Sequence, residues 1–243
     1  MKKRIDELLL ASGLADNLIQ ARALIGAGQV LVNEQLMDKA GCLVASDVRL
    51  QVKPSCPYVS RGGLKLKGGL DAFGYDPSGQ VCADIGASSG GFTDCLLQHG
   101  ASKIYAVDVA YGQLDWKLRQ DPRVIVIERF NARKISTSQI PDSLDLIVID
   151  SSFISLTKLL PPLLPLFGTQ GHIIALIKPQ FELPREKIPK GGVVRDQNLH
   201  DEAIAKIQQY SQNIGLTNHG VVRSPLLGPK GNSEFLILLT LKR

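Results

Sequence analysis

Cysteine and histidine are scarce in this chain of 243 residues, which contains four of each. The cysteines show neither a C-x-x-C pair nor the spacing of a metal site, and no two histidines stand at ligand spacing: Cys42, Cys56, Cys82 and Cys95. We therefore expect no metal centre and no disulfide framework, but reduced and mostly buried thiols, as in a cytoplasmic protein.

The chain also lacks a long uninterrupted apolar run. Its most apolar region, residues 146–167, is interrupted by Asp150, Lys158 and three prolines, and so is not expected to span a bilayer. The basic start Met1-Lys-Lys-Arg4 is followed by Asp6 and Glu7 rather than by an apolar stretch, which is unlike a secretory signal. A cytoplasmic location without a membrane partner is the expectation.

What the chain does contain is typical of a globular protein, with 44% hydrophobic and 21% charged residues. The length allows one large domain, or a large and a small one. A net charge of +5 and a pI near 9.0 favour an anionic partner.

The most informative stretch is a glycine-rich turn between an apolar strand that begins at Val81 and a helix that opens near Gly91. It has neither Gly-x-Gly-x-x-Gly spacing nor a Gly-Lys-Ser/Thr triplet, which argues against a dinucleotide or a nucleoside triphosphate. Its backbone N–H groups and the positive end of the helix still suit a carboxylate. An ordinary tight strand-to-helix turn is the alternative.

Two further predicted strands end in polar residues. The strand from Lys103 ends at Asp108, and the strand from Val124 ends at Glu128, with Asn131 just beyond. An acidic side chain at the end of the second strand can accept hydrogen bonds from both hydroxyls of a ribose. Together with Asp84, these strand ends resemble the nucleoside side of a methyltransferase that uses S-adenosylmethionine.

Charged residues also mark the later strands. Asp150 and Lys178 each end an apolar strand, and Glu234 begins the last one. A lysine at the end of a core strand is costly unless it has a partner or a lowered pKa. If the last strand is antiparallel, these side chains share one rim, and Lys65 from a preceding helix can join them. Surface salt bridges are the alternative for each residue taken alone.

Further elements are a helix over 157–167 that breaks near Pro161-Pro162, a helix over 199–214, and strands at 171–178, 221–224 and 234–241, which give a sheet of about seven strands.

Residues 1 to about 53 are predicted to form a small α+β module with short helices near 5–13 and 17–27 and strands at 29–33 and 48–52. Arg4-Ile-Asp-Glu-Leu-Leu9, Ala21-Arg-Ala-Leu-Ile-Gly-Ala-Gly-Gln-Val-Leu-Val-Asn33 and Asp38-Lys-Ala-Gly41 resemble the S-four RNA-binding domain. That family docks on structured RNA with basic residues, here Lys2, Lys3, Arg4 and Arg22. A protein-docking module is the alternative.

The proline-flanked segment 53–58 is expected to be a stiff linker, which divides the chain into domains 1–58 and 59–243.

The larger domain has its own candidate RNA contacts. Four basic residues surround Gly191-Gly192, and another follows Ser60 in a glycine-rich segment: Arg185, Lys187, Lys190, Arg195 and Arg61.

Five motifs of the larger domain resemble the TlyA-type ribosomal RNA methyltransferases, a family that has also been called haemolysins. They are Ser60-Arg-Gly-Gly-Leu-Lys65, Asp84-Ile-Gly-Ala-Ser-Ser-Gly-Gly-Phe-Thr-Asp94, Val148-Ile-Asp-Ser-Ser-Phe-Ile-Ser-Leu156, Leu176-Ile-Lys-Pro-Gln-Phe-Glu182 and Gly228-Pro-Lys-Gly-Asn-Ser-Glu234. The resemblance covers nearly the whole chain. It implies an α/β, Rossmann-like FtsJ fold with seven strands and an antiparallel last strand. It also implies methyl transfer from S-adenosylmethionine to a ribose 2′-oxygen, on cytidine of ribosomal RNA in a ribosomal subunit.

The resemblance further implies roles for individual residues. A catalytic tetrad falls on Lys65, Asp150, Lys178 and Glu234, with Lys67 as an alternative to Lys65. The donor's methionine part would be held by Asp84 and the loop after it, its ribose by Asp108, and its adenine near Glu128 and Asn131. Five residues of that loop are implied to bind the donor, and so is Asp150 of the tetrad: Gly86, Ser88, Gly90, Gly91 and Phe92.

A ribose hydroxyl is a poor nucleophile at neutral pH, so it must lose its proton or have its developing charge stabilised. A lysine with a lowered pKa can act as the base, and we assign that role to Lys178, with Lys65 as a second positive charge. Asp150 and Glu234 would orient the lysines, and no metal is required. An RNA base methyltransferase and a non-catalytic RNA-binding or ribosome-assembly protein remain alternatives. A pore-forming haemolysin would need a segment that inserts into a membrane, and no such segment is visible in this sequence.

Overall fold

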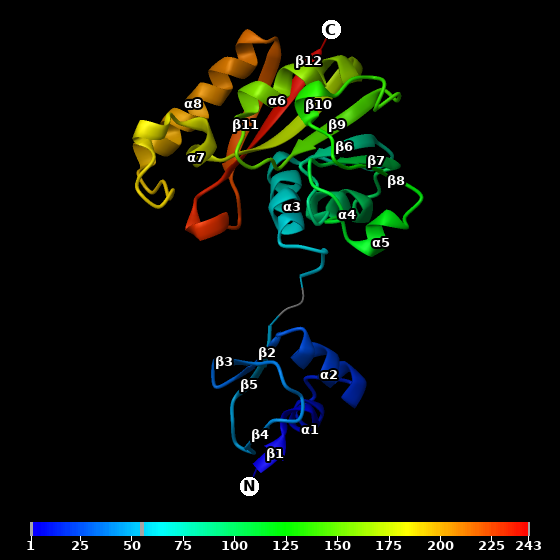
Figure 1. Cartoon of the computed structure of the whole chain (residues 1–243), viewed down its shortest axis with the longest axis vertical. Coiled ribbons are helices and arrows are strands. Elements are labelled where there is room, and N and C mark those ends of the chain that lie inside the picture. Colours follow the sequence, from blue (N-terminus) through cyan, green and yellow to red (C-terminus); the bar gives the residue numbers. More distant parts are fainter. Residues whose placement is uncertain (1, 54–55, 243) are drawn as a thin grey trace. The chain divides into compact units, whose positions relative to one another are not determined.

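The computed structural model describes residues 2–53 and 56–242, so part of the expected linker at 53–58 lies outside the described residues. The chain divides into two compact units, residues 1–56 and 57–243 (Figure 1). No helix among the described residues is long and apolar enough to cross a membrane.

The first unit has two helices and two small antiparallel sheets. Its elements are β1 (Lys2–Arg4), α1 (Ile5–Ala11), α2 (Leu18–Gly26), β2 (Val30–Val32), β3 (Gln35–Met37), β4 (Leu43–Ala45) and β5 (Leu50–Val52). Strand β1 pairs with β4, and the other sheet has the order β3-β2-β5. The side chain of Asn17 caps α2 by accepting a hydrogen bond from the Gln20 N–H at 2.8 Å. Ile5, Leu9 and Ile25 are buried in the core between the helices and strands.

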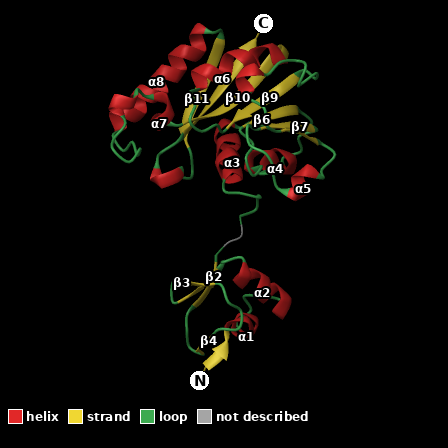
Figure 2. Cartoon of the chain, viewed as in Figure 1, coloured by secondary structure: helices red, strands yellow, loops and turns green. Residues whose placement is uncertain are grey.

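The second unit is built on one seven-stranded sheet. Its strands are β6 (Val81–Ile85), β7 (Lys103–Val107), β8 (Val124–Ile127), β9 (Leu144–Ile149), β10 (Phe167–Ile177), β11 (Leu216–Arg223) and β12 (Phe235–Lys242). The order is β11-β12-β10-β9-β6-β7-β8, and β12 is antiparallel to both of its neighbours. Figure 2 shows the strands of this sheet in yellow, with helices in red. The expected Rossmann-like sheet with an antiparallel last strand is confirmed. The carboxyl ends of β6, β7, β9 and β10 therefore share one rim with the beginning of β12.

Helices cover both faces of this sheet (Figure 1). They are α3 (Gly62–Phe73), α4 (Gly91–Gln98), α5 (Trp116–Arg119), α6 (Leu156–Leu163), α7 (Pro179–Glu182) and α8 (Gln197–Asn213). Short 3-10 turns lie at Ala132–Lys134, Leu164–Leu166, Arg185–Lys187 and Pro229–Gly231. Strands β6 and β9 and the second half of β10, residues 173–177, are almost wholly buried because layers of helices lie on both sides.

The expected break near Pro161-Pro162 is wrong. Helix α6 runs through both prolines to Leu163 and then tightens into a 3-10 turn. One face of this helix buries four leucines in the core: Leu156, Leu159, Leu160 and Leu163. That burial offsets the two hydrogen bonds that the prolines cannot donate.

Candidate active site

Two adjoining cavities lie at the rim where the carboxyl ends of β6, β7 and β9 meet. The larger has a volume of about 870 Å³ and extends to α3, the end of β10 and the loop before β12; the smaller, of about 350 Å³, lies beyond β7 and β9. Four residues line both: Gly86, Ser88, Asp150 and Ser152. A ligand in one cavity would thus adjoin a ligand in the other.

The glycines of the β6–α4 loop allow the backbone to form the wall between the cavities. Gly86 has a φ of 87°, and a Cβ there would stand 2.7 Å from the Asp150 carbonyl oxygen. A Cβ at Gly91 would collide with the Ser60 side chain, which lines the larger cavity. Only glycine permits both close approaches, so the loop presents backbone rather than side chains at these points.

Asp84, at the end of β6, is a fully buried carboxylate behind that loop. Its Oδ2 accepts hydrogen bonds from the Thr93 N–H at 2.9 Å and the Thr93 hydroxyl at 2.7 Å. Its Oδ1 is buried and has no hydrogen-bond partner among the described residues. Burial, with smaller contributions from the nearby carboxylates of Asp150 and Asp108, raises the pKa of Asp84 to about 7, although the Thr93 hydrogen bonds act in the opposite direction.

Asp108, at the end of β7, lines the smaller cavity together with Asn131. Its two oxygens accept hydrogen bonds from the Ser88 N–H at 2.7 Å and the Ala110 N–H at 2.8 Å, so it also fixes the glycine loop. Glu128, which was expected near an adenine, does not line either cavity: it pairs with Arg119 and accepts a hydrogen bond from the Gly112 N–H at 3.0 Å.

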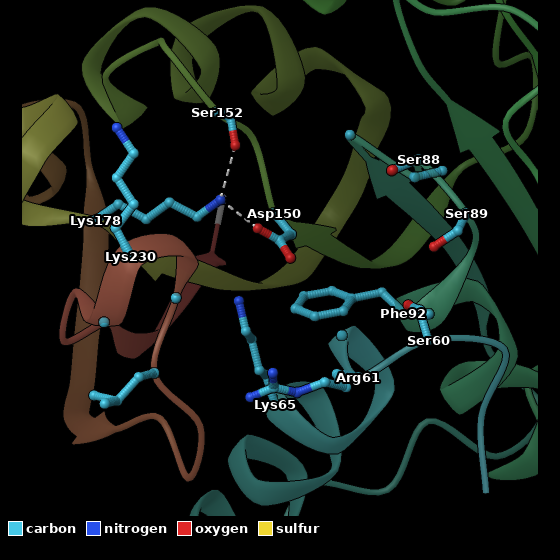
Figure 3. A pocket seen from close by; sticks show the side chains of 17 residues that line it. Ser60, Arg61, Lys65, Ser88, Ser89, Phe92, Asp150, Ser152, Lys178 and Lys230 are labelled. Carbon is cyan, nitrogen blue, oxygen red and sulfur yellow. Dashed lines mark hydrogen bonds and ion pairs between the residues drawn. The ribbon is translucent and has the colours of Figure 1, made fainter. Parts of the chain in front are cut away.

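Lys178 follows β10 and reaches into the larger cavity, where its side chain lies between two polar groups (Figure 3). Its Nζ is 2.5 Å from Asp150 Oδ1 and donates to the Ser152 hydroxyl at 3.3 Å. The residue is only 5% exposed. The amino nitrogen is therefore held at one position in the cavity wall.

A second buried ion pair lies on the other side of the same cavity. Lys65 of α3 lines the cavity, and its Nζ is 2.7 Å from Glu234 Oε2. Glu234 is buried just before β12, and its Oε1 has no hydrogen-bond partner in the described part of the chain. Lys67 instead pairs with Asp71 along the helix at 2.5 Å and does not line the cavity. Of the two candidate lysines, it is therefore Lys65 that adjoins the site.

The predicted RNA contacts are distributed over both units. Arg61 lines the larger cavity, whereas the four basic residues at 185–195 are exposed on the segment after α7, with Lys187 paired to Glu202 at 2.6 Å. In the first unit Lys3 is exposed. Arg4 and Arg22 both pair with the buried Asp6, at 2.8 and 2.9 Å, so each guanidinium is positioned by a carboxylate.

Several cavity residues were not predicted. Ser60, Ser152, Leu227 and Lys230 line the larger cavity, and Phe153 lines the smaller one although it is 90% exposed. These residues lie in loops, where no periodicity marks them. The one usable indication was Phe153, a large apolar side chain in a polar segment directly after a strand end.

Comparison of the chain with known proteins shows the family to which it belongs. Residues 58–241 match the model of the FtsJ-like methyltransferases. The chain is 42% identical over 240 residues to the 16S/23S rRNA (cytidine-2′-O)-methyltransferase TlyA of Mycobacterium tuberculosis, covering 98% of this chain and 90% of that protein. It is 39% identical over 234 residues to Hemolysin A of Brachyspira hyodysenteriae, covering 96% and 98%.

A solved structure from Streptococcus thermophilus, called a hemolysin, has a TM-score of 0.78 to this chain at 39% identity and covers 99% of this chain and 89% of its own. The expectation of a methyltransferase that uses S-adenosylmethionine is confirmed at the level of the family. The chain belongs to the FtsJ-like methyltransferases, and TlyA and Hemolysin A are among its relatives.

Proposed function

We propose that this protein transfers a methyl group from S-adenosylmethionine to a ribose 2′-hydroxyl of ribosomal RNA, with cytidine as the acceptor nucleotide. The observation that carries the proposal is the position of Lys178, whose Nζ is fixed by Asp150 and Ser152 in the wall of a cavity that adjoins a second one. The name of the M. tuberculosis relative supports the ribose and the cytidine.

The residues around the smaller cavity fit the donor. S-adenosylmethionine carries a sulfonium and an ammonium group. Asp108 and Asp150 line the smaller cavity, and Asp84 lies buried on the strand between theirs without lining either cavity. Asp84 Oδ1 is buried without a hydrogen-bond partner among the described residues, and burial raises the pKa of this carboxyl group, so a cation bound nearby would stabilise its charged form. Asp84 and the glycine loop would hold the methionine part, and Asp108 and Asn131 the nucleoside.

The donor, when bound, supplies a methyl group on sulfur that an oxygen can displace in line. The protein's part is to place that oxygen and to deal with its proton. Lys178 would accept the proton of the 2′-hydroxyl or stabilise the negative charge that develops on it. Asp150 and Ser152 fix the direction of the lysine, and the Lys65–Glu234 pair adds charge on the opposite wall.

Basic residues on both units would bind the RNA. Arg61 adjoins the acceptor cavity. The exposed segment 185–195 adds three further cations, which form no ion pair with an acidic side chain among the described residues: Arg185, Lys190 and Arg195. The first unit would contribute Arg4 and Arg22, oriented by Asp6. Planar guanidinium groups held in this way suit phosphate recognition.

The test is methyl transfer from labelled S-adenosylmethionine to ribosomal subunits that lack the modification. The product RNA is digested to nucleosides, and the label is located on the sugar or on the base. We expect 2′-O-methylcytidine. Label on a base would refute ribose methylation in favour of a base methyltransferase, and RNA binding without any label would favour a non-catalytic protein.

Donor affinity should depend on pH through Asp84. Below its pKa of about 7 the carboxyl group is mostly neutral, and above it the group is charged. A cationic donor binds the charged form better. As pH decreases below 7, the free protein takes up a proton that it must release on binding, so the affinity for the donor should fall by up to about ten-fold per pH unit. Calorimetric titration between pH 5.5 and 7.5 measures this. Asp84→Asn should bind weakly at every pH, and a wild-type affinity that stays flat across the range would contradict the assignment.

Asp108→Ala should weaken S-adenosylmethionine binding by about 1.5–3 kcal/mol, because it removes a charged acceptor from the cavity. The substitution also releases the Ser88 N–H that Asp108 fixes, so the loop adds to the loss. Isothermal calorimetry gives the affinity. Asp115→Ala is a matched control, since that aspartate caps α5 and lines neither cavity. An unchanged affinity of the Asp108 variant would remove this residue from the donor site.

A further inference from the structure

The loop between β7 and α5 exposes large apolar side chains that the site described above does not use. Tyr111 is 68% exposed and Trp116 is 70% exposed, and Trp116 is the single tryptophan of the chain. Neither lines the two cavities described above, whereas Val109 on the same loop lines the smaller one. Two exposed aromatic rings at the rim of a binding site indicate a contact surface rather than a packing defect.

Arg129 is held against this loop. Its guanidinium lies 4.1 Å from the centre of the Tyr111 ring, and the backbone N–H of Arg129 donates to the Ala110 carbonyl at 3.1 Å. The residue has a φ of 55°, a conformation that costs energy in any residue other than glycine. Glu128 pairs with Arg119 and accepts the Gly112 N–H, so the two loops are tied at a second point. The arginine and the ring together form a flat, positively charged surface.

The surrounding segment carries excess positive charge. Residues 109–134 contain six Lys/Arg and three Asp/Glu. Arg119 and Arg123 are neutralised by Glu128 and Asp121, and Lys117 pairs with Asp94. The charge of Arg129 is directed instead onto an aromatic ring. An anionic partner with flat rings fits this combination better than an apolar one does.

The loop is also connected to the catalytic rim. The Asp115 N–H donates to the Ser89 carbonyl at 3.2 Å, and Ser89 lines the larger cavity. Trp116 is the next residue and begins α5. A chain of nucleotides that enters the larger cavity can therefore continue over this loop.

We propose that Tyr111 with Arg129, and Trp116, form a stacking surface for unpaired bases of the substrate RNA next to the acceptor nucleotide. The proposal rests on RNA as the substrate. Single-stranded RNA is bound by stacking bases on aromatic rings and on arginine planes, with cations for the phosphates. Because Tyr111 lies outside the smaller cavity, this surface recognises RNA and does not cover the donor.

The test compares binding of full-length variants to unmodified ribosomal subunits at fixed salt and without donor. Tyr111→Ala, Arg129→Ala and Trp116→Ala should each raise the Kd by about ten-fold, within the range that stacking contributes per base. Tyr111→Phe keeps the ring and should stay within about two-fold of wild type. Ile125→Ala, an exposed apolar residue of β8 outside the surface, is the matched control and should not change the Kd.

The single tryptophan provides a direct readout. Titration with a single-stranded oligocytidylate should quench Trp116 fluorescence in the wild-type protein, and Tyr111→Ala should shift that titration to higher RNA concentration. Unquenched fluorescence at RNA saturation, or unchanged Kd values for the alanine variants, would overturn the proposal.

The failure modes are distinguishable. If Tyr111→Ala weakens S-adenosylmethionine binding but not RNA binding, the loop covers the donor and the stacking proposal is wrong. If the wild-type protein binds RNA with quenching but never transfers methyl, the stacking surface stands and the proposed function fails.

Discussion

Lys178→Ala should abolish methyl transfer and leave S-adenosylmethionine binding nearly intact. The amino group lies between Asp150 and Ser152 in the wall of the larger cavity, where the 2′-hydroxyl would bind. In the proposed mechanism, its removal would take from the hydroxyl both its proton acceptor and the group that stabilises its charge. Single-turnover transfer to ribosomal subunits measures the first effect, and calorimetry with the donor alone measures the second.

Lys178→Arg separates the two roles of this lysine. A guanidinium stays protonated and cannot act as base, so the arginine variant should be almost as inactive as the alanine variant. Substantial activity of the arginine variant would leave Lys178 as an electrostatic group only. Full activity of the alanine variant would refute the mechanism. Lys67→Ala is the matched control, because that lysine lies on α3 outside the cavity and should keep its activity.

Glu234→Ala should cost less than loss of the lysine, roughly the 10²–10⁴-fold of a supporting acid–base group or below. The structure adds a reason to test Glu234→Gln beside it. Alanine would leave the buried Lys65 charge without its partner and lower the stability of the fold, whereas glutamine keeps an oxygen near the lysine.

A protein that begins at Tyr58 should still bind S-adenosylmethionine but lose most of its RNA affinity. The second unit is compact without the first, and the residues just after the linker already belong to it. The Val59 N–H donates to Asp94 at 2.7 Å, a contact that the shortened protein keeps. The first unit would supply affinity through Arg4 and Arg22 rather than chemistry.

Binding of the full-length protein to ribosomal subunits should also fall steeply with salt, because phosphate contacts release counterions. The shortened protein should show a smaller salt dependence. In the full chain, Arg22→Ala should reduce both the affinity and the slope, whereas Glu34→Ala, in the turn between β2 and β3, should not reduce them. Equal RNA affinity of the long and short proteins would show that the first unit does something else.

The sequence by itself determined the class of fold and most of the residues near the site. Short, mostly apolar segments that lead to Asp84, Asp108, Asp150 and Lys178 are enough to predict parallel strands with polar residues at one rim. The glycine loop was equally legible, because only glycine tolerates the positive φ and close approach found at Gly86. These features are local, so the periodicity and residue types of a short segment encode them.

Only the tertiary structure decided which side chains become partners. Lys65 and Glu234 are 169 positions apart and meet because β12 inserts antiparallel beside β10, while Lys67 turns away on the same helix. Glu128 ends a strand as predicted but is taken up by Arg119, and two arginines of the first unit converge on Asp6. Such pairings depend on strand order and on side-chain direction across distant segments. A pattern within one segment carries no information about either, because the energy of each pair is set by burial that exists only in the folded chain.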